Sequence, residues 1–144
     1  MEQRISLVTL AVADVARSQR FYVDGLGWRP ELEAPGVVMI KAGEHLLFSL
    51  WAAAEFEEEV GPIARGSGVA PLTLAHNVGS RGEVDAVLQT ARAAGAEPVS
   101  EAVDRSWGGY SGYFGDPDGY RWEIAWAPGQ VNAIVVPSRA GTPQ

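Results

Sequence analysis

The sequence predicts an α+β fold built from two tandem βαβββ modules, and two observations predict it. An apolar, β-branched strand followed by a helix and a glycine stop occurs at residues 5–27 and again at residues 69–95. Three short strand-like segments follow each helix. Their close spacing indicates antiparallel hairpins, because a parallel connection needs a crossover of about a dozen residues.

The first module begins with a β-branched segment at residues 5–12, which predicts a buried strand. Asp14 is then a plausible N-cap for a helix over residues 15–23, where apolar side chains recur at helical spacing. Gly25-Leu26-Gly27 ends that helix. Three strands are expected next, at residues 28–33, 37–41 and 46–51.

An acidic connector over residues 52–68, with one short helix, separates the modules, because four glutamates and several glycines interrupt the strand pattern there. The second module begins with a strand at 69–78 and a helix at 81–94, capped by Ser80 and ended by Gly95. Its other strands are expected at 98–103, 109–114 and 120–126. An extra edge strand is expected at 131–136 and a disordered tail at 137–144.

We therefore expect a single domain over residues 1–144. Its parts are the first module at 5–51, the connector at 52–68, the second module at 69–128 and a C-terminal tail at 129–144.

The segment Asp116-Pro117-Asp118-Gly119 predicts a tight turn, because proline presets the turn and glycine accepts a positive φ. In the strand that follows, Trp122 faces the core, and Glu123 faces the other side. A carboxylate in mid-strand is either satisfied by a neighbouring arginine or hydroxyl, or belongs to a site in a cavity. The strand alone leaves both interpretations open.

Composition limits the function classes. The 144 residues are 47% hydrophobic and carry a formal net charge of −7, which disfavours binding to nucleic acid or to anionic lipid. The chain has no cysteine, so a disulfide framework, a cysteine-ligated zinc site and a thiolate nucleophile are excluded. No signal peptide or membrane-spanning run is recognisable, and we expect a cytoplasmic protein.

Two motifs, together with the duplicated module, resemble the vicinal oxygen chelate superfamily, which includes glyoxalase I, extradiol dioxygenases, and fosfomycin-resistance and bleomycin-binding proteins. The early motif is Leu10-Ala11-Val12-Ala13-Asp14 before a helix that ends in Phe21-Tyr22. The late motif is Gly115-Asp116-Pro117-Asp118-Gly119-Tyr120-Arg121-Trp122-Glu123. The resemblance covers about residues 5–128 and implies a cupped, largely antiparallel sheet of the glyoxalase/bleomycin-resistance type.

The resemblance also implies where metal ligands would lie in metal-dependent members, namely on the first and last strand of each module. Glu123 occupies the late carboxylate position, whereas the positions in the two first strands are Leu7 and Thr73. The fourth position falls among Leu47, Phe48 and Ser49. Because one carboxylate cannot hold a catalytic divalent ion alone, we expect no metal and no cofactor.

Neither histidine obviously supplies a missing ligand. His45 lies beside a turn at the start of a strand, and His76 alternates away from Thr73, Ala75 and Asn77. A β-bulge would turn His76 into the cup.

The predicted ligand-binding residues are the side chains expected to line the cup. All of them are polar or aromatic except Leu7. They are Leu7, Thr9, Ser49, Trp51, Thr73, Asn77, Trp107, Tyr110, Tyr113 and Glu123.

Such a cup would suit a flat aromatic or cationic organic molecule, held by stacking and by one charge-assisted hydrogen bond, as in a sequestering protein. The alternative is a metal-free isomerase or lyase in which Glu123 is the general base. A metal-dependent lyase or dioxygenase is less favoured, and a purely structural protein would have a filled cup. The resemblance implies a homodimer, in which modules could be exchanged.

Overall fold

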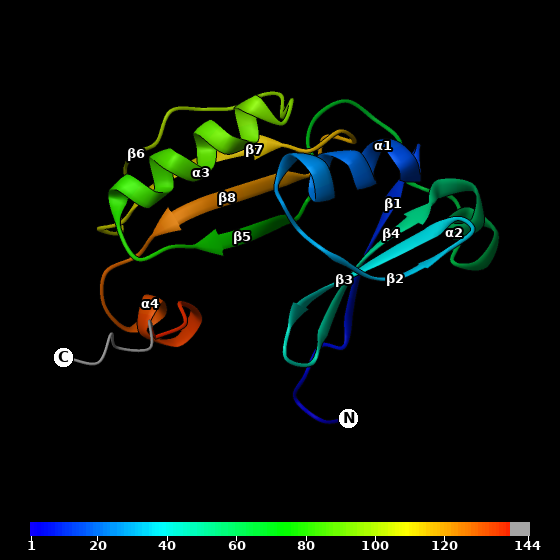
Figure 1. Cartoon of the computed structure of the whole chain (residues 1–144), viewed down its shortest axis with the longest axis horizontal. Coiled ribbons are helices and arrows are strands. Elements are labelled where there is room, and N and C mark those ends of the chain that lie inside the picture. Colours follow the sequence, from blue (N-terminus) through cyan, green and yellow to red (C-terminus); the bar gives the residue numbers. More distant parts are fainter. Residues whose placement is uncertain (139–144) are drawn as a thin grey trace.

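Two four-stranded mixed sheets form the body of the protein in a computed structural model that describes residues 1–138 (Figure 1). Sheet one contains β1 (Leu7–Val12), β2 (Pro30–Ala34), β3 (Val37–Gly43) and β4 (Leu46–Ala52), in the order β1-β4-β3-β2. Sheet two contains β5 (Thr73–Asn77), β6 (Val103–Asp104), β7 (Tyr110–Gly115) and β8 (Arg121–Trp126), in the order β5-β8-β7-β6. In each sheet the first strand runs parallel to the last, and the other pairs are antiparallel. The predicted α+β class with two βαβββ modules is confirmed.

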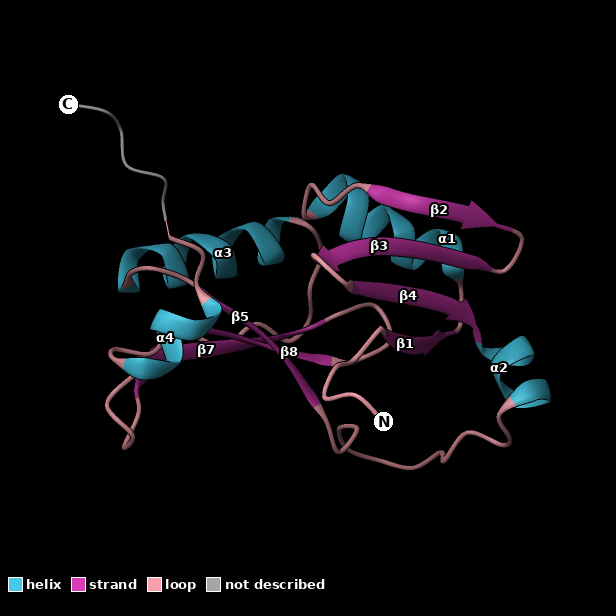
Figure 2. Ribbon diagram, turned by 90° about the horizontal axis from the view of Figure 1, so that it is seen from below, coloured by secondary structure: helices cyan, strands magenta, loops and turns pink. Residues whose placement is uncertain are grey.

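Helices cover one face of each sheet (Figure 2). The helical segments are α1 (Val15–Gln19), which continues as the π-helix η1 (Arg20–Gly25), α2 (Ala53–Glu59), α3 (Arg81–Ala93) and α4 (Gln130–Val135). The α1 helix packs on sheet one and α3 packs on sheet two, whereas α4 lies on the opposite side of sheet two from α3. Within residues 1–138, no helix has both the length and the apolar character needed to cross a bilayer.

Both predicted N-caps are confirmed. The Asp14 side chain accepts a hydrogen bond from the backbone N–H of Arg17 at 3.1 Å, and the Ser80 hydroxyl accepts one from Glu83 at 3.3 Å. These side chains satisfy backbone donors that have no partner inside the first helical turn. The two helices therefore begin where the sequence predicts.

The predicted edge strand at residues 131–136 is wrong, because this segment forms the helix α4. Its β-branched composition favours a strand, but tertiary contacts of one side chain oppose it. Asn132 accepts a hydrogen bond from the backbone N–H of Ala127 at 3.2 Å and donates one to the carbonyl of Val78 at 2.9 Å. These bonds hold a helical turn against the end of β5. Residues 139–144 of the expected tail lie outside the described residues.

The predicted strand at residues 98–103 is also mostly wrong. Only β6 pairs there, together with an isolated bridge between Val99 and Phe114. The Ser100 hydroxyl accepts the backbone N–H of Tyr113 at 2.9 Å, so a side chain takes a donor that a regular ladder would give to a carbonyl. Pro98 has no N–H to donate, which further prevents a continuous strand.

The predicted strand at residues 28–33 is displaced and starts at Pro30. The Trp28 N–H instead donates to the carbonyl of Tyr22 at 3.0 Å, which turns this residue back toward η1. The indole of Trp28 therefore packs against the core and not in the sheet.

The predicted turn between β7 and β8 is confirmed, and it fastens the second module to the first. The backbone N–H of Gly119 donates to the carbonyl of Asp116 at 2.9 Å, and Gly119 has φ +86°. Asp118 accepts hydrogen bonds from the Ala13 N–H at 2.8 Å and from the Ser18 hydroxyl at 3.2 Å. Arg17 adds an ion pair to the same carboxylate at 3.4 Å.

Asp116 is buried, with 3% of its surface exposed, and is fully hydrogen-bonded. Its carboxylate accepts the Tyr22 hydroxyl at 2.7 Å and the backbone N–H groups of Asp118 and Tyr120 at 3.0 and 2.9 Å. Burial raises the pKa of Asp116, and these three donors partly offset the rise. The Trp122 indole N–H donates to the Tyr22 oxygen at 3.0 Å, so one tyrosine hydroxyl links both modules.

An aromatic core continues this link. Tyr22 and Phe48 of the first module pack with ring centroids 5.1 Å apart, and each ring also contacts Trp122, at 6.2 and 5.7 Å. Phe114 stacks on Trp122, with ring centroids 6.2 Å apart. Large aromatic surfaces from both modules are thus removed from water at one interface.

We expect Tyr22→Phe to lower the free energy of unfolding by about 2–3 kcal/mol, because it leaves the buried Asp116 carboxylate with one donor fewer and the Trp122 N–H without an acceptor. Urea denaturation at pH 7 measures the change. Tyr113→Phe, at a half-buried position outside this network, is the matched control and should cost less than about 1 kcal/mol. Equal losses in the two variants would contradict the role of the network.

Candidate functional site

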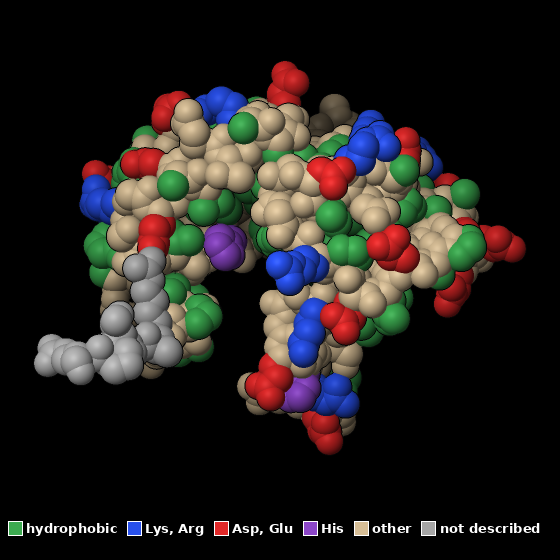
Figure 3. All heavy atoms as spheres, viewed as in Figure 1, with side chains coloured by type: hydrophobic (Ala, Val, Ile, Leu, Met, Phe, Trp, Pro, Cys, Tyr) green, Lys and Arg blue, Asp and Glu red, His purple; other side chains and the backbone are tan. Residues whose placement is uncertain are grey.

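A cleft of about 550 Å³ lies between the two modules (Figure 3). Three aromatic side chains form its centre, Trp28 after η1, Phe48 in β4 and Trp122 in β8. Their ring centroids are 5.6 to 5.8 Å apart, and all three pairs meet edge to face. Phe48 and Trp122 are buried, with 3% and 7% of their surface exposed, so the half-buried Trp28 supplies most of the aromatic surface that faces the cleft.

Each aromatic side chain is positioned by a separate local feature. Trp28 follows Gly27, whose φ of +78° lets the chain reverse after η1. Phe48 faces the core in the middle of β4, and the Trp122 indole is oriented by its hydrogen bond to Tyr22. The network that joins the modules therefore also positions a wall of the cleft.

The remaining walls are largely aliphatic and come from both modules. They are formed by Val8, Ile40, Ala42, Leu46, Leu47, Leu74 and Ala75.

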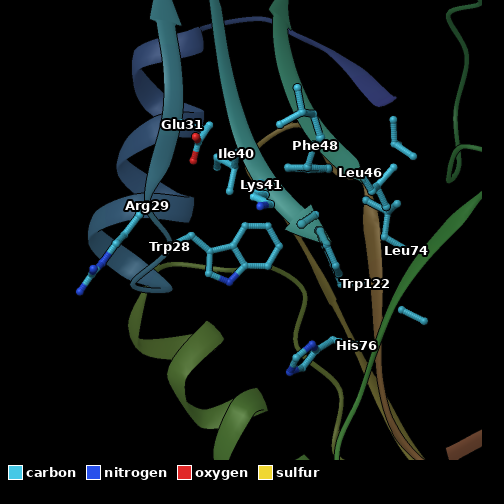
Figure 4. Close-up of a pocket in the computed structure, with 14 residues that line it drawn as sticks. Trp28, Arg29, Glu31, Ile40, Lys41, Leu46, Phe48, Leu74, His76 and Trp122 are labelled. Atoms are coloured by element: carbon cyan, nitrogen blue, oxygen red, sulfur yellow. The ribbon is translucent and has the colours of Figure 1, made fainter. Parts of the chain in front are cut away.

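Four exposed polar side chains line the edge, or mouth, of the cleft, and Figure 4 shows the Arg29 side chain extending away from the Trp28 ring and from Lys41. Arg29, Glu31 and Lys41 belong to the first module, and His76 lies across from them on β5. Among the described residues, the side chains of Arg29 and Lys41 make no ion pair and no hydrogen bond. The mouth therefore carries two basic groups and one carboxylate at neutral pH.

A smaller cavity of about 260 Å³ adjoins this cleft and shares Trp28, His76 and Trp122 with it. Val87 and Thr90 of α3 form its other side. The cleft and this cavity together extend along the interface between the modules, from the β3–β4 hairpin to α3.

Most of the predicted site residues lie elsewhere, on what we call the outer faces, the sides of the two sheets that point away from α1 and α3. On sheet one, Thr9 pairs in register with Ser49, and Trp51 lies two residue pairs further along on the same face. Leu7 is on this face and is 45% exposed. The first-module residues are therefore brought together.

On sheet two, Glu123 pairs in register with Ala75 on one side and Tyr113 on the other. Thr73 and Asn77 share this face by strand alternation. Burial, and after it the hydrogen bond to Glu123, raise the pKa of the Tyr113 hydroxyl, while Arg105 over its ring at 5.5 Å opposes the rise. The Glu123 carboxylate thus has a tyrosine partner within the sheet.

Hydrogen bonds to helices direct one predicted site residue, Tyr110, away from the outer faces and engage two that lie on them, Asn77 and Trp51. Tyr110 lies on the α3 side of sheet two, where its hydroxyl donates to Asp85 at 2.9 Å. The Asn77 amide donates to Asn132 of α4 at 3.0 Å. The Trp51 indole donates to Glu55 of α2 at 2.8 Å.

Trp107 lies in the loop between β6 and β7 and is 54% exposed. Its ring covers Gly109 so closely that a Cβ there would collide with the indole. The glycine is required for this contact, and Trp107 is not among the residues that line the cleft.

His76 stays on the face predicted by alternation, because β5 pairs with β8 without a register shift. It therefore borders the cleft between the modules and does not reach Glu123 on the outer face. His45 lies at the β3–β4 turn, where its ring is within 3.6 Å of Glu44.

Sequence reasoning missed Trp28, Phe48 and Lys41 as site residues and assigned Trp122 only to the core. One signal was present, because Lys41 is the single lysine of the chain and follows an apolar run in its strand. The cleft itself depends on contacts between segments more than 70 residues apart.

The residues at the positions implied for metal ligands do not fit a metal. They are Leu7, Thr73 and Glu123, with one of Leu47, Phe48 and Ser49 as the fourth, and they supply one carboxylate and at most two hydroxyls. Within residues 1–138, no three His, Asp or Glu side chains cluster closely enough to hold a metal ion. Zinc sites use about three protein ligands and hard cations about six oxygens.

The two mixed sheets, with the Asp-Pro-Asp-Gly turn anchored to the first helix, define a small protein of the paired βαβββ class. A model of the Glyoxalase/Bleomycin resistance protein/Dioxygenase superfamily matches residues 4–124, and the chain belongs to this superfamily.

Solved structures agree with the family assignment. The chain is 34% identical to a glyoxalase-related enzyme from Fulvimarina pelagi, with a TM-score of 0.79 over 88% of this chain and 90% of that one. It is 27% identical to a glyoxalase/bleomycin resistance protein/dioxygenase from Nocardioides, with a TM-score of 0.75 over 90% of each chain. A lactoylglutathione lyase from Agrobacterium tumefaciens is 26% identical, with a TM-score of 0.66 over 87% of this chain and 94% of that one. None of the curated proteins matches the sequence.

We expect that adding Mn²⁺, Ni²⁺ or Zn²⁺ to protein pretreated with a chelator leaves the melting temperature unchanged, because a specifically bound ion would stabilise the folded state. Thermal denaturation with each ion, and metal analysis of protein purified without chelator, measure this. A stoichiometric ion whose retention is lost in Glu123→Gln would overturn the ligand assignment.

Proposed function

We propose that this protein binds a small organic molecule with a flat aromatic ring in the cleft between its modules, without a metal ion, and so sequesters it. The observation that carries the proposal is the fixed group of Trp28, Phe48 and Trp122 at the centre of the cleft. Flat apolar surface with a polar mouth suits stacking of a ring with its substituents directed to solvent.

The size of the cleft supports a ligand of this class. Its volume of about 550 Å³ lies within the range of roughly 300–1,000 Å³ that small-molecule sites occupy. The Trp122 ring in the wall of the cleft is held in one position, because its indole N–H donates to the Tyr22 hydroxyl and its ring stacks on Phe114. A preformed site loses less entropy on binding than one that must order first.

The residues at the implied metal-ligand positions favour binding without turnover over lyase chemistry. One of the similar structures is named a lactoylglutathione lyase and others carry the name bleomycin resistance protein. This chain has Leu7 and Thr73 where the resemblance implies metal ligands, and Glu123 already interacts with Tyr113. General-base chemistry at Glu123 remains the second candidate, and its signature would be turnover that Glu123→Gln abolishes.

We expect Leu46→Trp to weaken binding of indole-3-acetamide at least about tenfold, because Leu46 lines the cleft and the larger ring fills the space that the probe needs. NMR titration of ¹⁵N-labelled protein measures the affinity. In the unsubstituted protein, the probe should shift the indole N–H signals of Trp28 and Trp122.

The matched control is Leu32→Trp, which makes the same change at a 58% exposed position of β2 that does not line the cleft and should leave the affinity unchanged. If Leu7→Trp and Glu123→Gln weaken binding while Leu46→Trp does not, the ligand occupies the outer faces and the cleft is not the site.

We further propose that two copies of the chain associate through the outer faces. The apolar residues Val131, Ile134 and Val135 of α4 are 56%, 74% and 51% exposed, and Leu7 and Ile5 are 45% and 68% exposed near the outer face of sheet one. Exposed apolar surface of this kind is typical of protein–protein contacts.

We expect Ile134→Glu to convert a homodimer into a monomer, because it places a charge in the apolar contact while the Asn132 hydrogen bonds still hold α4. Light scattering coupled to size exclusion measures the mass. Val60→Glu, at a 64% exposed position after α2, is the control and should leave the dimer intact. A monomeric unsubstituted protein would exclude this mode of association.

A further inference from the structure

We infer that the molecule bound in the cleft is an aromatic acid, whose ring lies against Trp28 and Trp122 and whose anionic group, such as a carboxylate, pairs with Arg29 and Lys41. This inference rests on the proposed function, because it names the ligand class of the same cleft. It differs from the sequence-based expectation, in which Glu123 would bind a cationic molecule.

The charge at the mouth of the cleft is opposite to that of the whole chain. The protein has 18 acidic and 11 basic residues, yet the cleft is lined by Arg29 and Lys41 against Glu31 alone. His76 adds a nitrogen that can donate a hydrogen bond from the opposite wall. An anion in the mouth is therefore attracted locally even though the net charge repels it.

The two basic groups also differ from most of the other basic groups within residues 1–138. Five of these pair with a carboxylate of the protein, namely Arg4, Arg17, Arg65, Arg81 and Arg92. By contrast, Arg29 and Lys41 have no such partner among residues 1–138, although Glu31 lines the same cleft. Their donors are thus not occupied by a protein partner. The exposed Arg29 side chain extends away from the cleft in Figure 4, so it must turn toward Lys41 when both groups pair with one anion.

The aromatic floor adds to the effect of these charges. A ring that covers Trp28 and Trp122 displaces water from the cleft and lowers the local dielectric constant, which strengthens an ion pair at its edge. Guanidinium and ammonium groups also form charge-assisted hydrogen bonds to carboxylates, which are about twice as strong as neutral ones. A cationic ligand in the same position would meet two like charges and one carboxylate.

Three probes with one ring system test the inference, namely indole-3-acetate, the neutral indole-3-acetamide and the cationic tryptamine. We expect the acetate to bind at least about fivefold more tightly than the amide and the amine more weakly than both. NMR titrations at constant ionic strength give the three affinities.

Two double variants then test which basic groups are responsible. Arg29→Gln/Lys41→Gln should weaken indole-3-acetate about tenfold and leave indole-3-acetamide within about twofold. Arg20→Gln/Arg92→Gln removes the same charge at exposed positions that do not line the cleft, and it should leave both affinities within about twofold at physiological salt. Glu31→Gln should strengthen acetate binding.

The outcomes separate the two proposals. If the amide or the amine binds as tightly as the acetate and still requires the cleft, the aromatic-acid inference is wrong and the binding function stands. If no probe binds in the cleft, the proposed function fails, and the inference fails with it. If the two double variants weaken the acetate equally, net charge and not direct pairing is responsible, and the inference is overturned.

Discussion

The buried hydrogen bonds around Asp116 hold the two modules together, and the remaining features of the structure depend on them. A carboxylate that is 3% exposed is tolerated only because the Tyr22 hydroxyl and two backbone N–H groups donate to it. The neighbouring Asp118 fixes the same turn to the start of α1 through Ala13 and Ser18. Two carboxylates of one turn thereby set the position of sheet two relative to the first helix.

This interaction links stability to the cleft. Tyr22 accepts the Trp122 indole N–H with the same oxygen that donates to Asp116, so the network that fixes the turn also orients a ring at the centre of the cleft. Trp122 then packs on Trp28 and Phe48, whose outward surfaces form the remaining aromatic wall. A site built on the contact between modules is rigid without requiring loops of its own.

The site itself could be predicted only in part. Strand alternation correctly puts Thr73 and Glu123 on one face of sheet two, because the β5–β8 register is regular. The same rule separates Tyr110 from Tyr113, and the structure indeed directs Tyr110 to α3. Strand alternation does not predict how the two sheets are placed relative to each other. The cleft is lined by residues of both modules, such as Trp28 and Leu74, which no local sequence pattern connects.

The sequence by itself determined the duplicated modules, the N-caps at Asp14 and Ser80 and the turn that ends at Gly119, because each depends on side chains within a few residues of one another. Only the tertiary structure decided that residues 130–135 are helical and that a cleft opens between the modules, since both result from contacts between distant segments. Local propensity acts over one or two turns of chain, whereas packing between modules selects among the local conformations that the sequence permits.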